Sequence, residues 1–204
     1  MATDSFLGLA KQPVSQEWRL AYGLPDNADL EGFLFPDTYR IDKAAAAADI
    51  IKKMLDNFQR KLTPAMLEEI KRQNKSVYEI IALASLVEKE VRTADDMKIV
   101  SGIFWQRIKN RQGLESCATL AYILGVNKAQ YSVADTKIDS PYNTYKYRGL
   151  PPGPIANPGL NAITAAIYPE ETDYNYFLSD PATGQTIFSR TLGEHNLNKA
   201  KYLK

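Results

Sequence analysis

The sequence has few residues that commonly bind metal ions or react as thiols. Its 204 residues include one cysteine, Cys117, and one histidine, His195. A single cysteine cannot form an intrachain disulfide, so cysteine pairing does not indicate the redox compartment. Metal sites usually combine several His, Cys or carboxylate ligands, and no such group has ligand spacing around His195. A serine or Cys117 nucleophile would also need this histidine as its base. We therefore predict no metal ion and disfavour a histidine-activated nucleophile.

Long apolar runs, a surplus of one charge and nucleotide-binding glycines are missing as well. No run of about 18 apolar residues and no signal peptide occurs, so the sequence predicts neither a membrane span nor an export signal. With 25 Lys and Arg against 24 Asp and Glu, the net charge of +1 does not suggest a nucleic-acid partner. Rigid prolines in Gly149–Gly153 replace the flexible glycines of phosphate-binding loops, so no nucleotide cofactor is expected. The chain is then either cytoplasmic or a fragment whose targeting segment has been removed.

The composition, 45% hydrophobic and 24% charged, is typical of one globular domain with a sizeable core and room for a small appendage. Apolar residues recur at helical spacing through most of the chain, and Thr63–Pro64 and Ser76 have the character of helix N-caps. Asp42 is the expected N-cap of the first long helix. The predicted helices cover residues 43–62, 64–73, 77–92, 95–109, 118–124, 160–167 and 192–203.

Three stretches lack helical periodicity. Residues 1–30 predict loop, a short strand and one helical turn. The runs 174–180 and 185–189, rich in aromatic and β-branched residues, flank a Pro-Ala-Thr-Gly turn and predict a β-hairpin. Residues 131–158 carry tyrosines, prolines and glycines without any period. A loop of this length in a compact domain is usually functional, although its tyrosines could also be ordinary core or rim packing.

The helix over Ile80–Arg92 is apolar almost throughout but ends with two carboxylates, Glu88 and Glu90. On a helical projection Glu90 shares a face with apolar residues, whereas Glu88 lies at the other margin of the apolar arc. A glutamate on an apolar face loses hydration, which raises its pKa and makes it a proton donor near neutral pH. The alternative is a solvated helix end in which Lys89 and Arg92 screen both acids. A helix-borne acid beside a loop rich in Tyr, Asn and Thr has the chemistry of a sugar-binding cleft.

Five short segments stand out along the chain. They are Leu30–Tyr39 (Leu-Glu-Gly-Phe-Leu-Phe-Pro-Asp-Thr-Tyr), Leu83–Glu90 (Leu-Ala-Ser-Leu-Val-Glu-Lys-Glu), Tyr142–Tyr145 (Tyr-Asn-Thr-Tyr), Gly149–Ile155 (Gly-Leu-Pro-Pro-Gly-Pro-Ile) and Asn157–Gly159 (Asn-Pro-Gly). In this order they resemble the signature segments of the MltG (YceG-like) family of endolytic murein transglycosylases. The resemblance covers about residues 30–200, and the joint match is more specific than any single segment.

The resemblance implies an α+β fold, with a lysozyme-like helical catalytic domain at residues 31–204 and a small β-hairpin region. Residues 1–30 would be an N-terminal extension that keeps at most the end of a LysM-like module. Full-length relatives are anchored by an N-terminal transmembrane helix that this chain lacks, so the expected location is the extracytoplasmic face of the bacterial cell membrane. The expected partner is the peptidoglycan glycan strand, with peptidoglycan synthases and divisome or elongasome proteins as further candidates and no nucleic acid.

The resemblance also implies roles for individual residues. Comparison with the Glu-Ser pair of other lysozyme-like transglycosylases makes Glu90 the catalytic acid, with Glu88 as the fallback. Relatives often read Leu-Gln-Ser-Asp-Pro-Thr where this chain has Leu114–Thr119, so only Ser116 and Thr119 are carried over there as cleft-lining groups. The expected substrate-binding residues are Glu88, Glu115, Ser116, Thr119, Tyr142, Asn143, Thr144, Tyr145, Leu150, Pro151, Pro152, Gly153 and Asn157.

The implied reaction is cleavage of MurNAc-GlcNAc bonds within a strand to give 1,6-anhydroMurNAc ends, which limits strand length. Glu90 would protonate the bridging oxygen and then accept the proton of the C6 hydroxyl of the same MurNAc. Two alternatives stay open. One is a muramidase that hydrolyses the same bond with water, for which Glu115 is the candidate second carboxylate. The other is a non-catalytic glycan-binding module.

Overall fold

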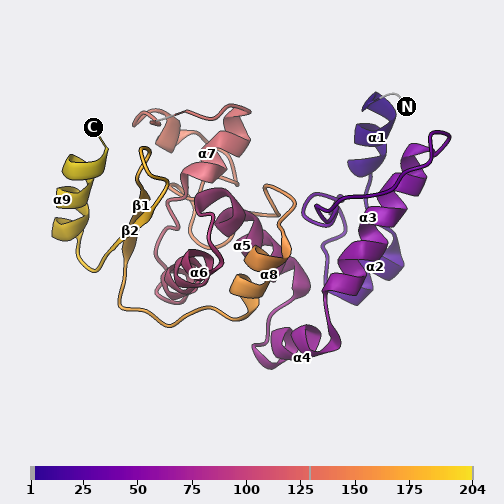
Figure 1. Ribbon diagram of the computed structural model, residues 1–204, viewed down its shortest axis with the longest axis horizontal. Helices are drawn as coiled ribbons and strands as arrows, with labels where there is room; N and C mark the ends of the chain where they lie inside the picture. Colours follow the sequence, from indigo (N-terminus) through magenta and orange to yellow (C-terminus); the bar gives the residue numbers. More distant parts are fainter. Residues whose placement is uncertain (1–2, 129, 204) are drawn as a thin grey trace.

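The structure is a computed structural model and describes residues 3–128 and 130–203. The helices in these residues are α1 (Thr3–Ala10), α2 (Gln16–Tyr22), α3 (Ala47–Lys61), α4 (Pro64–Arg72), α5 (Val77–Glu90), α6 (Ala94–Lys109), α7 (Cys117–Leu124), α8 (Leu160–Ile167) and α9 (Leu192–Tyr202), with a short 3₁₀ helix, η1, at Asp135–Lys137. The strands β1 (Tyr176–Ser179) and β2 (Thr186–Ser189) pair with each other. Figure 1 shows α5, α6 and α8 in the middle, α1–α3 on one side, and the hairpin with α9 on the other.

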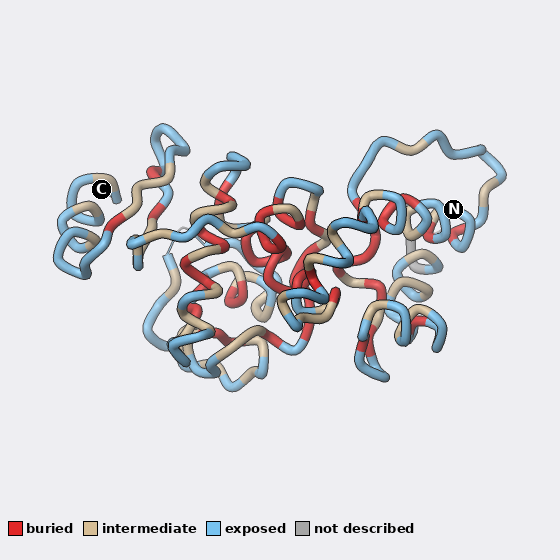
Figure 2. Tube along the Cα trace, turned by 90° about the horizontal axis from the view of Figure 1, so that it is seen from below, coloured by how far each residue is buried: buried red, intermediate tan, exposed pale blue. Residues whose placement is uncertain are grey.

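Helix α5 is the centre of the fold. Its N-terminus is closed by the predicted capping box, in which the Ser76 hydroxyl accepts from the Glu79 amide at 3.1 Å and Glu79 accepts from the Ser76 amide at 2.8 Å. Every residue from 80 to 87 is buried, as expected of a helix that is apolar nearly all round. The helix packs against α6 and α8. Figure 2 shows the buried segments concentrated in this central region.

The N-terminal segment differs from its prediction, because its described residues form α1 and α2 rather than loop and a strand. The Ser15 hydroxyl accepts from the Trp18 amide to start α2, and Gly23 ends it in the left-handed conformation at φ 66°. Trp18 then packs edge-on against Phe33, which contacts Phe58 of α3 at a ring separation of 5.2 Å. These rings belong to the same hydrophobic cluster as the core of α5.

Helix α3 begins at Ala47, four residues later than Lys43, where the sequence predicted it. Asp42 is not its N-cap. Its carboxylate instead accepts from the Ala44 amide at 2.8 Å and closes a local turn. The helix is started by Asp49, which accepts from the Ala46 amide at 3.0 Å. The other helix boundaries lie close to their predicted positions, and Thr63 caps α4 ahead of Pro64.

The loop predicted over residues 131–158 is irregular, as expected, apart from η1. It is nevertheless fixed to the core. Ser85 of α5 accepts from the Ile155 amide at 3.0 Å, and Asn157 accepts from the Leu34 amide at 2.9 Å. Gly32 has φ +89°, and a Cβ placed there would lie 2.5 Å from Pro154, so only glycine fits this contact. Residues 32–34 therefore hold the proline-rich loop, residues 151–158, against α5.

The C-terminal region contains the predicted hairpin. Strands β1 and β2 are antiparallel, with Phe177 opposite Phe188, and α9 packs on them. Asp180 closes the connecting turn by accepting from the Ala182 amide at 2.9 Å and the Thr183 hydroxyl at 2.8 Å. The predicted α+β class is confirmed. None of the described helices is both long and apolar enough to cross a membrane.

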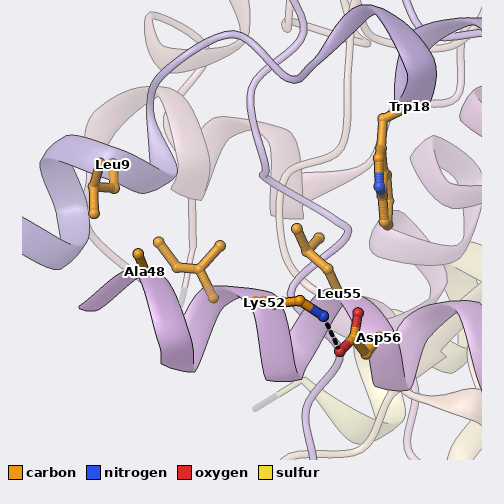
Figure 3. Close-up of a pocket in the computed structure, with 7 residues that line it drawn as sticks. Leu9, Trp18, Ala48, Lys52, Leu55 and Asp56 are labelled. Atoms are coloured by element: carbon orange, nitrogen blue, oxygen red, sulfur yellow. Dashed lines mark hydrogen bonds and ion pairs between the residues drawn. The ribbon is translucent and has the colours of Figure 1, made fainter. Parts of the chain in front are cut away.

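A groove of about 410 Å³ lies among the three N-terminal helices. The residues lining it are Leu9, Trp18, Ala48, Ile51, Lys52, Leu55 and Asp56. Figure 3 shows these side chains around the groove, with the Lys52–Asp56 ion pair of 2.8 Å along α3. Neither predicted carboxylate of α5 contributes to it, so the predicted chemistry lies elsewhere.

Candidate active site

Glu90 is the last residue of α5, at a sharp corner of the chain. Val91 leaves the helix in an extended conformation, with φ −141° and ψ 162°. Thr93 then caps α6 by accepting from the Asp96 amide at 3.1 Å. The Glu90 carbonyl accepts a hydrogen bond from the Ser179 hydroxyl of β1 at 3.4 Å. The corner brings the end of α5 next to β1 and leaves the Glu90 side chain facing α7.

The Glu90 carboxylate lies at the N-terminus of α7. The Ser116 hydroxyl donates to Glu90 Oε1, and the Ala118 amide approaches the same oxygen at 3.5 Å. The side chain is half-buried, and burial raises the pKa of Glu90 because the charged form loses hydration. The two hydrogen bonds and the charge of Arg107 act in the opposite direction without cancelling this effect. A glutamate with a raised pKa in a partly open position is suited to donate a proton.

A buried hydroxyl cluster fixes Ser116 in place. The Ser116 amide donates to Thr144 Oγ1 at 3.1 Å. Thr144 and Thr119 share a hydrogen bond of 3.0 Å, and Thr119 also donates to the Ser116 carbonyl at 2.8 Å. All three side chains are at most 3% exposed. They therefore support the acid from behind rather than lining the cleft as predicted.

A cleft of about 390 Å³ opens in front of Glu90. Its lining comes from the end of α5, α7, the segment after α7 and the proline-rich loop: Lys89, Glu90, Cys117, Ala118, Ala121, Tyr122, Gly125, Val126, Asn127, Lys128, Tyr131 and Ile155. Tyr122 is 40% exposed, and its ring lies 5.0 Å from that of Tyr142. Lys128 is held by Asp135 at 3.0 Å. The cleft thus combines an acid, two tyrosines, an amide and two lysines, a composition suited to a polar sugar chain.

Glu88 does not lie beside Glu90. Two residues along a helix correspond to about 200° of rotation, so the two side chains point in different directions. Glu88 Oε2 accepts from the Gly159 amide at 3.1 Å, and Gly159 is the N-cap of α8. The carboxylate therefore satisfies the first turn of α8, where the helix dipole favours a negative charge.

Several other predicted substrate-binding residues hold the loop in shape. Asn143 is fully buried and donates to the carbonyls of Thr136 and Ile138 at 3.1 and 2.8 Å. Asn157 anchors the Leu34 amide, as described above. Pro151 and Gly153 are buried, Leu150 is half-buried and Pro152 is exposed. The Pro152 carbonyl accepts from the Tyr78 hydroxyl at 3.0 Å.

Tyr142, Tyr145 and Glu115 lie nearer the acid. The Tyr145 hydroxyl contacts Cys117 Sγ at 3.1 Å, and burial raises the pKa of both groups. Tyr142 contacts the cleft through the ring of Tyr122. Glu115 is exposed, adopts φ +51°, and donates its amide to the Thr144 carbonyl at 3.2 Å. Its charge acts on Arg107, raising the pKa of the guanidinium against the larger effect of burial, and Glu115 is not part of the cleft lining.

Besides Lys89 of α5, four polar cleft residues were not predicted: Tyr122, Asn127, Lys128 and Tyr131. The sequence carries a signal for one of them, because Tyr122 interrupts an otherwise apolar short helix. The other three follow α7 in a segment whose fold depends on side-chain contacts such as Tyr131 to the Val126 carbonyl at 3.1 Å. Among the residues that the structure describes, no group of three His, Cys, Asp or Glu side chains is placed to hold a metal ion.

Comparison with known proteins identifies the family. Residues 5–201 match the YceG-like family. The chain belongs to that family. Curated relatives named endolytic murein transglycosylase are 41% identical in Bacillus subtilis (strain 168) and 36% identical in Streptococcus pneumoniae (strain D39), each over 179 residues and 85% of this chain. A crystal structure of a yceG-like protein from Listeria monocytogenes, 33% identical, superimposes with a TM-score of 0.84 over 98% of this YceG-like chain and 68% of that chain.

The YceG-like chain spans only part of these relatives. The matched region is 48% of the Bacillus protein and 32% of the Streptococcus protein. The Listeria match includes nearly all of this chain, so the arrangement of α1–α9 and the hairpin is that of a known YceG-like fold.

Proposed function

We propose that this chain is a catalytic domain that cleaves the glycan strands of peptidoglycan as a lytic transglycosylase. The relatives named endolytic murein transglycosylase support the substrate and the reaction class. The observation that carries the proposal is Glu90, a half-buried acid with a raised pKa, held by Ser116 at the mouth of a cleft of about 390 Å³.

In the proposed reaction, protonated Glu90 donates its proton to the oxygen that bridges MurNAc C1 and GlcNAc. The C1–O bond breaks, and the GlcNAc fragment leaves with a new hydroxyl. The Glu90 carboxylate then takes the proton of the MurNAc C6 hydroxyl while that oxygen bonds to C1. The products are a 1,6-anhydroMurNAc end and a protonated Glu90, so no water is consumed. Positioned proton transfer of this kind contributes about 10² to 10⁴ in rate.

One feature favours the transglycosylase over a muramidase. Glycosidases that use water work with two carboxylates across the scissile bond. Among the described residues that line the cleft, Glu90 is the one carboxylate, whereas Glu115 is exposed and is not part of that lining. A single acid that returns to its protonated form matches attack by the sugar's own C6 hydroxyl.

Mass spectrometry of products from uncrosslinked glycan strands tests the proposal. The wild-type protein is expected to give 1,6-anhydroMurNAc ends, and Glu90→Gln is expected to abolish them. Reducing MurNAc ends would instead establish the muramidase, and Glu115→Gln would then be the decisive variant. Strand binding without cleavage by the wild type would establish a glycan-binding module.

The proposed activity also places the domain at the cell wall, on the extracytoplasmic face of the membrane. Peptidoglycan synthases and divisome or elongasome proteins are the candidate partners there, because they make or use the same strands. Cross-linking in intact cells followed by mass spectrometry tests these contacts.

A further inference from the structure

Arg107 of α6 bridges two segments that are far apart in the sequence. One terminal nitrogen donates to the Leu114 carbonyl at 2.6 Å, and the other donates to the Asn175 carbonyl at 2.8 Å. The guanidinium is half-buried and lies 6.0 Å from the centre of the Tyr176 ring. A guanidinium holds its two terminal nitrogens at a fixed separation in one plane, whereas the three donors of a lysine share a single nitrogen.

Both segments held by Arg107 contact Glu90. Leu114 lies two residues before Ser116, whose hydroxyl donates to the Glu90 carboxylate. Asn175 leads directly into β1, and Ser179 of that strand donates to the Glu90 carbonyl at 3.4 Å. The arginine therefore fixes the two neighbours that define where Glu90 points.

The charge of Arg107 also acts on the acid. The groups with titratable character around Glu90 are Lys89 on its own helix, Arg107 on α6, Cys117 on α7 and Tyr145 in the loop. Those around Arg107 are Glu90, Glu115, Tyr145, Tyr176 and His195. Arg107 is the cation whose field favours the Glu90 carboxylate.

We propose that Arg107 is a positioning residue for Glu90, orienting it through the segment at Leu114 and the start of β1 while stabilising the carboxylate left after proton donation. This inference rests on the proposed transglycosylase function, because the carboxylate must persist until the C6 hydroxyl returns a proton. Without that cation, burial would raise the pKa of Glu90 further and make the carboxylate formed by proton donation less stable.

Two variants separate charge from orientation. Arg107→Met removes the charge and both hydrogen bonds, whereas Arg107→Lys keeps the charge but replaces the two separately placed donor nitrogens with one nitrogen. Lys109→Met is the matched control, since it removes one exposed cation from the same helix. For each protein, anhydro product formation is followed as kcat/KM against pH, and the melting temperature reports folding.

The acid must be protonated to work, so activity falls as pH rises through the Glu90 pKa. Removing the cation raises that pKa, so Arg107→Met is expected to shift the alkaline limb of the pH profile to higher pH while lowering kcat at least about tenfold. Arg107→Lys is expected to lower kcat, while the pH at which activity falls on the alkaline side stays close to the wild-type value. Lys109→Met is expected to match the wild type. Equal alkaline limbs in Arg107→Met and the wild type would overturn the proposal.

A titration without substrate keeps this result separate from the proposed function. Carboxyl-¹³C glutamate labelling, with Glu90 assigned through Glu90→Gln, gives the Glu90 pKa directly. A higher value in Arg107→Met than in the wild type is expected even if no glycan is cleaved, and an unchanged value overturns the electrostatic role. If Arg107→Met does not fold, Arg107→Gln takes its place in both measurements.

Discussion

Ser116 and Glu90 are 26 positions apart in the sequence, yet the Ser116 hydroxyl donates directly to the Glu90 carboxylate. Ser116 occupies the N-cap position of α7, but its hydroxyl does not cap the helix and is free to bond Glu90. The Ser116 amide is held by Thr144. The direction of the acid therefore depends on two loop segments that the chain brings together only on folding.

The Ser116→Ala variant removes the hydroxyl that orients the acid. We expect the cleavage rate to fall about 10- to 100-fold, since small misplacements of a catalytic group carry costs of this size. The lost hydrogen bond also raises the Glu90 pKa, so the remaining activity extends to higher pH. Rates across the pH range measure both effects. Ser132→Ala, which removes a hydroxyl from an exposed turn, is the control, and a wild-type rate in Ser116→Ala would mean that Glu90 needs no such partner.

Glu90→Gln is expected to stabilise the fold while abolishing cleavage. A glutamate whose folded pKa exceeds its unfolded value contributes stability below the unfolded pKa and loses it as pH rises through the folded pKa. At about pH 8 the variant avoids burying a charge and should gain about 0.5–2 kcal/mol, whereas at about pH 4 the gain should vanish. Denaturant unfolding at both pH values measures the difference. A pH-independent effect would contradict the raised pKa.

Tyr122→Ala is expected to weaken substrate binding more than chemistry. Its ring is 40% exposed on the cleft wall, where it can stack on a sugar. Loss of one such contact should raise KM about 3- to 10-fold with little change in kcat. Tyr168→Ala is a matched control, because Tyr168 is 41% exposed and lies outside the cleft lining. Equal KM values for the two variants would remove Tyr122 from the binding surface.

Glu88→Gln is expected to affect stability rather than cleavage. The side chain holds the first turn of α8 through the Gly159 amide, and loss of its charge should cost about 0.3–1 kcal/mol. Thermal unfolding and product yield measure the two effects. A large fall in kcat at unchanged stability would restore Glu88 as part of the site.

The sequence predicted helix boundaries best where one or two neighbouring side chains decide where the helix begins. Pro64 behind Thr63, and Ser76 paired with Glu79, are local signals that act in any context. The predicted start of α3 at Lys43 was wrong because an aspartate such as Asp42 can either cap a helix or close a turn. In the structure it closes a turn. α1 and α2 were missed because residues 1–30 show no sustained apolar period and are interrupted by Pro13, Gly23 and Pro25.

The candidate site was predictable to the extent that it lies on one helix. The helical projection put Glu90 and Glu88 at different positions around the helix. In the structure Glu90 lies against α7 and Glu88 against α8. The cleft lining was not predictable in the same way, because Asn127 and Lys128 reach it through the fold of the segment after α7 rather than through any local pattern. Polar residues of the long loop were taken for binding groups, yet Asn143 is occupied by backbone carbonyls.

The clamp between Gly32 and Pro154 has a mechanical consequence. The same segment carries Phe33, which is packed into the aromatic cluster of α2 and α3, while Ile155 beside Pro154 lines the cleft. A ligand or partner that tilts the N-terminal helices would therefore pull on one wall of the cleft. The packing of the N-terminal helices and the wall of the cleft that contains Ile155 are thus connected through one glycine–proline contact.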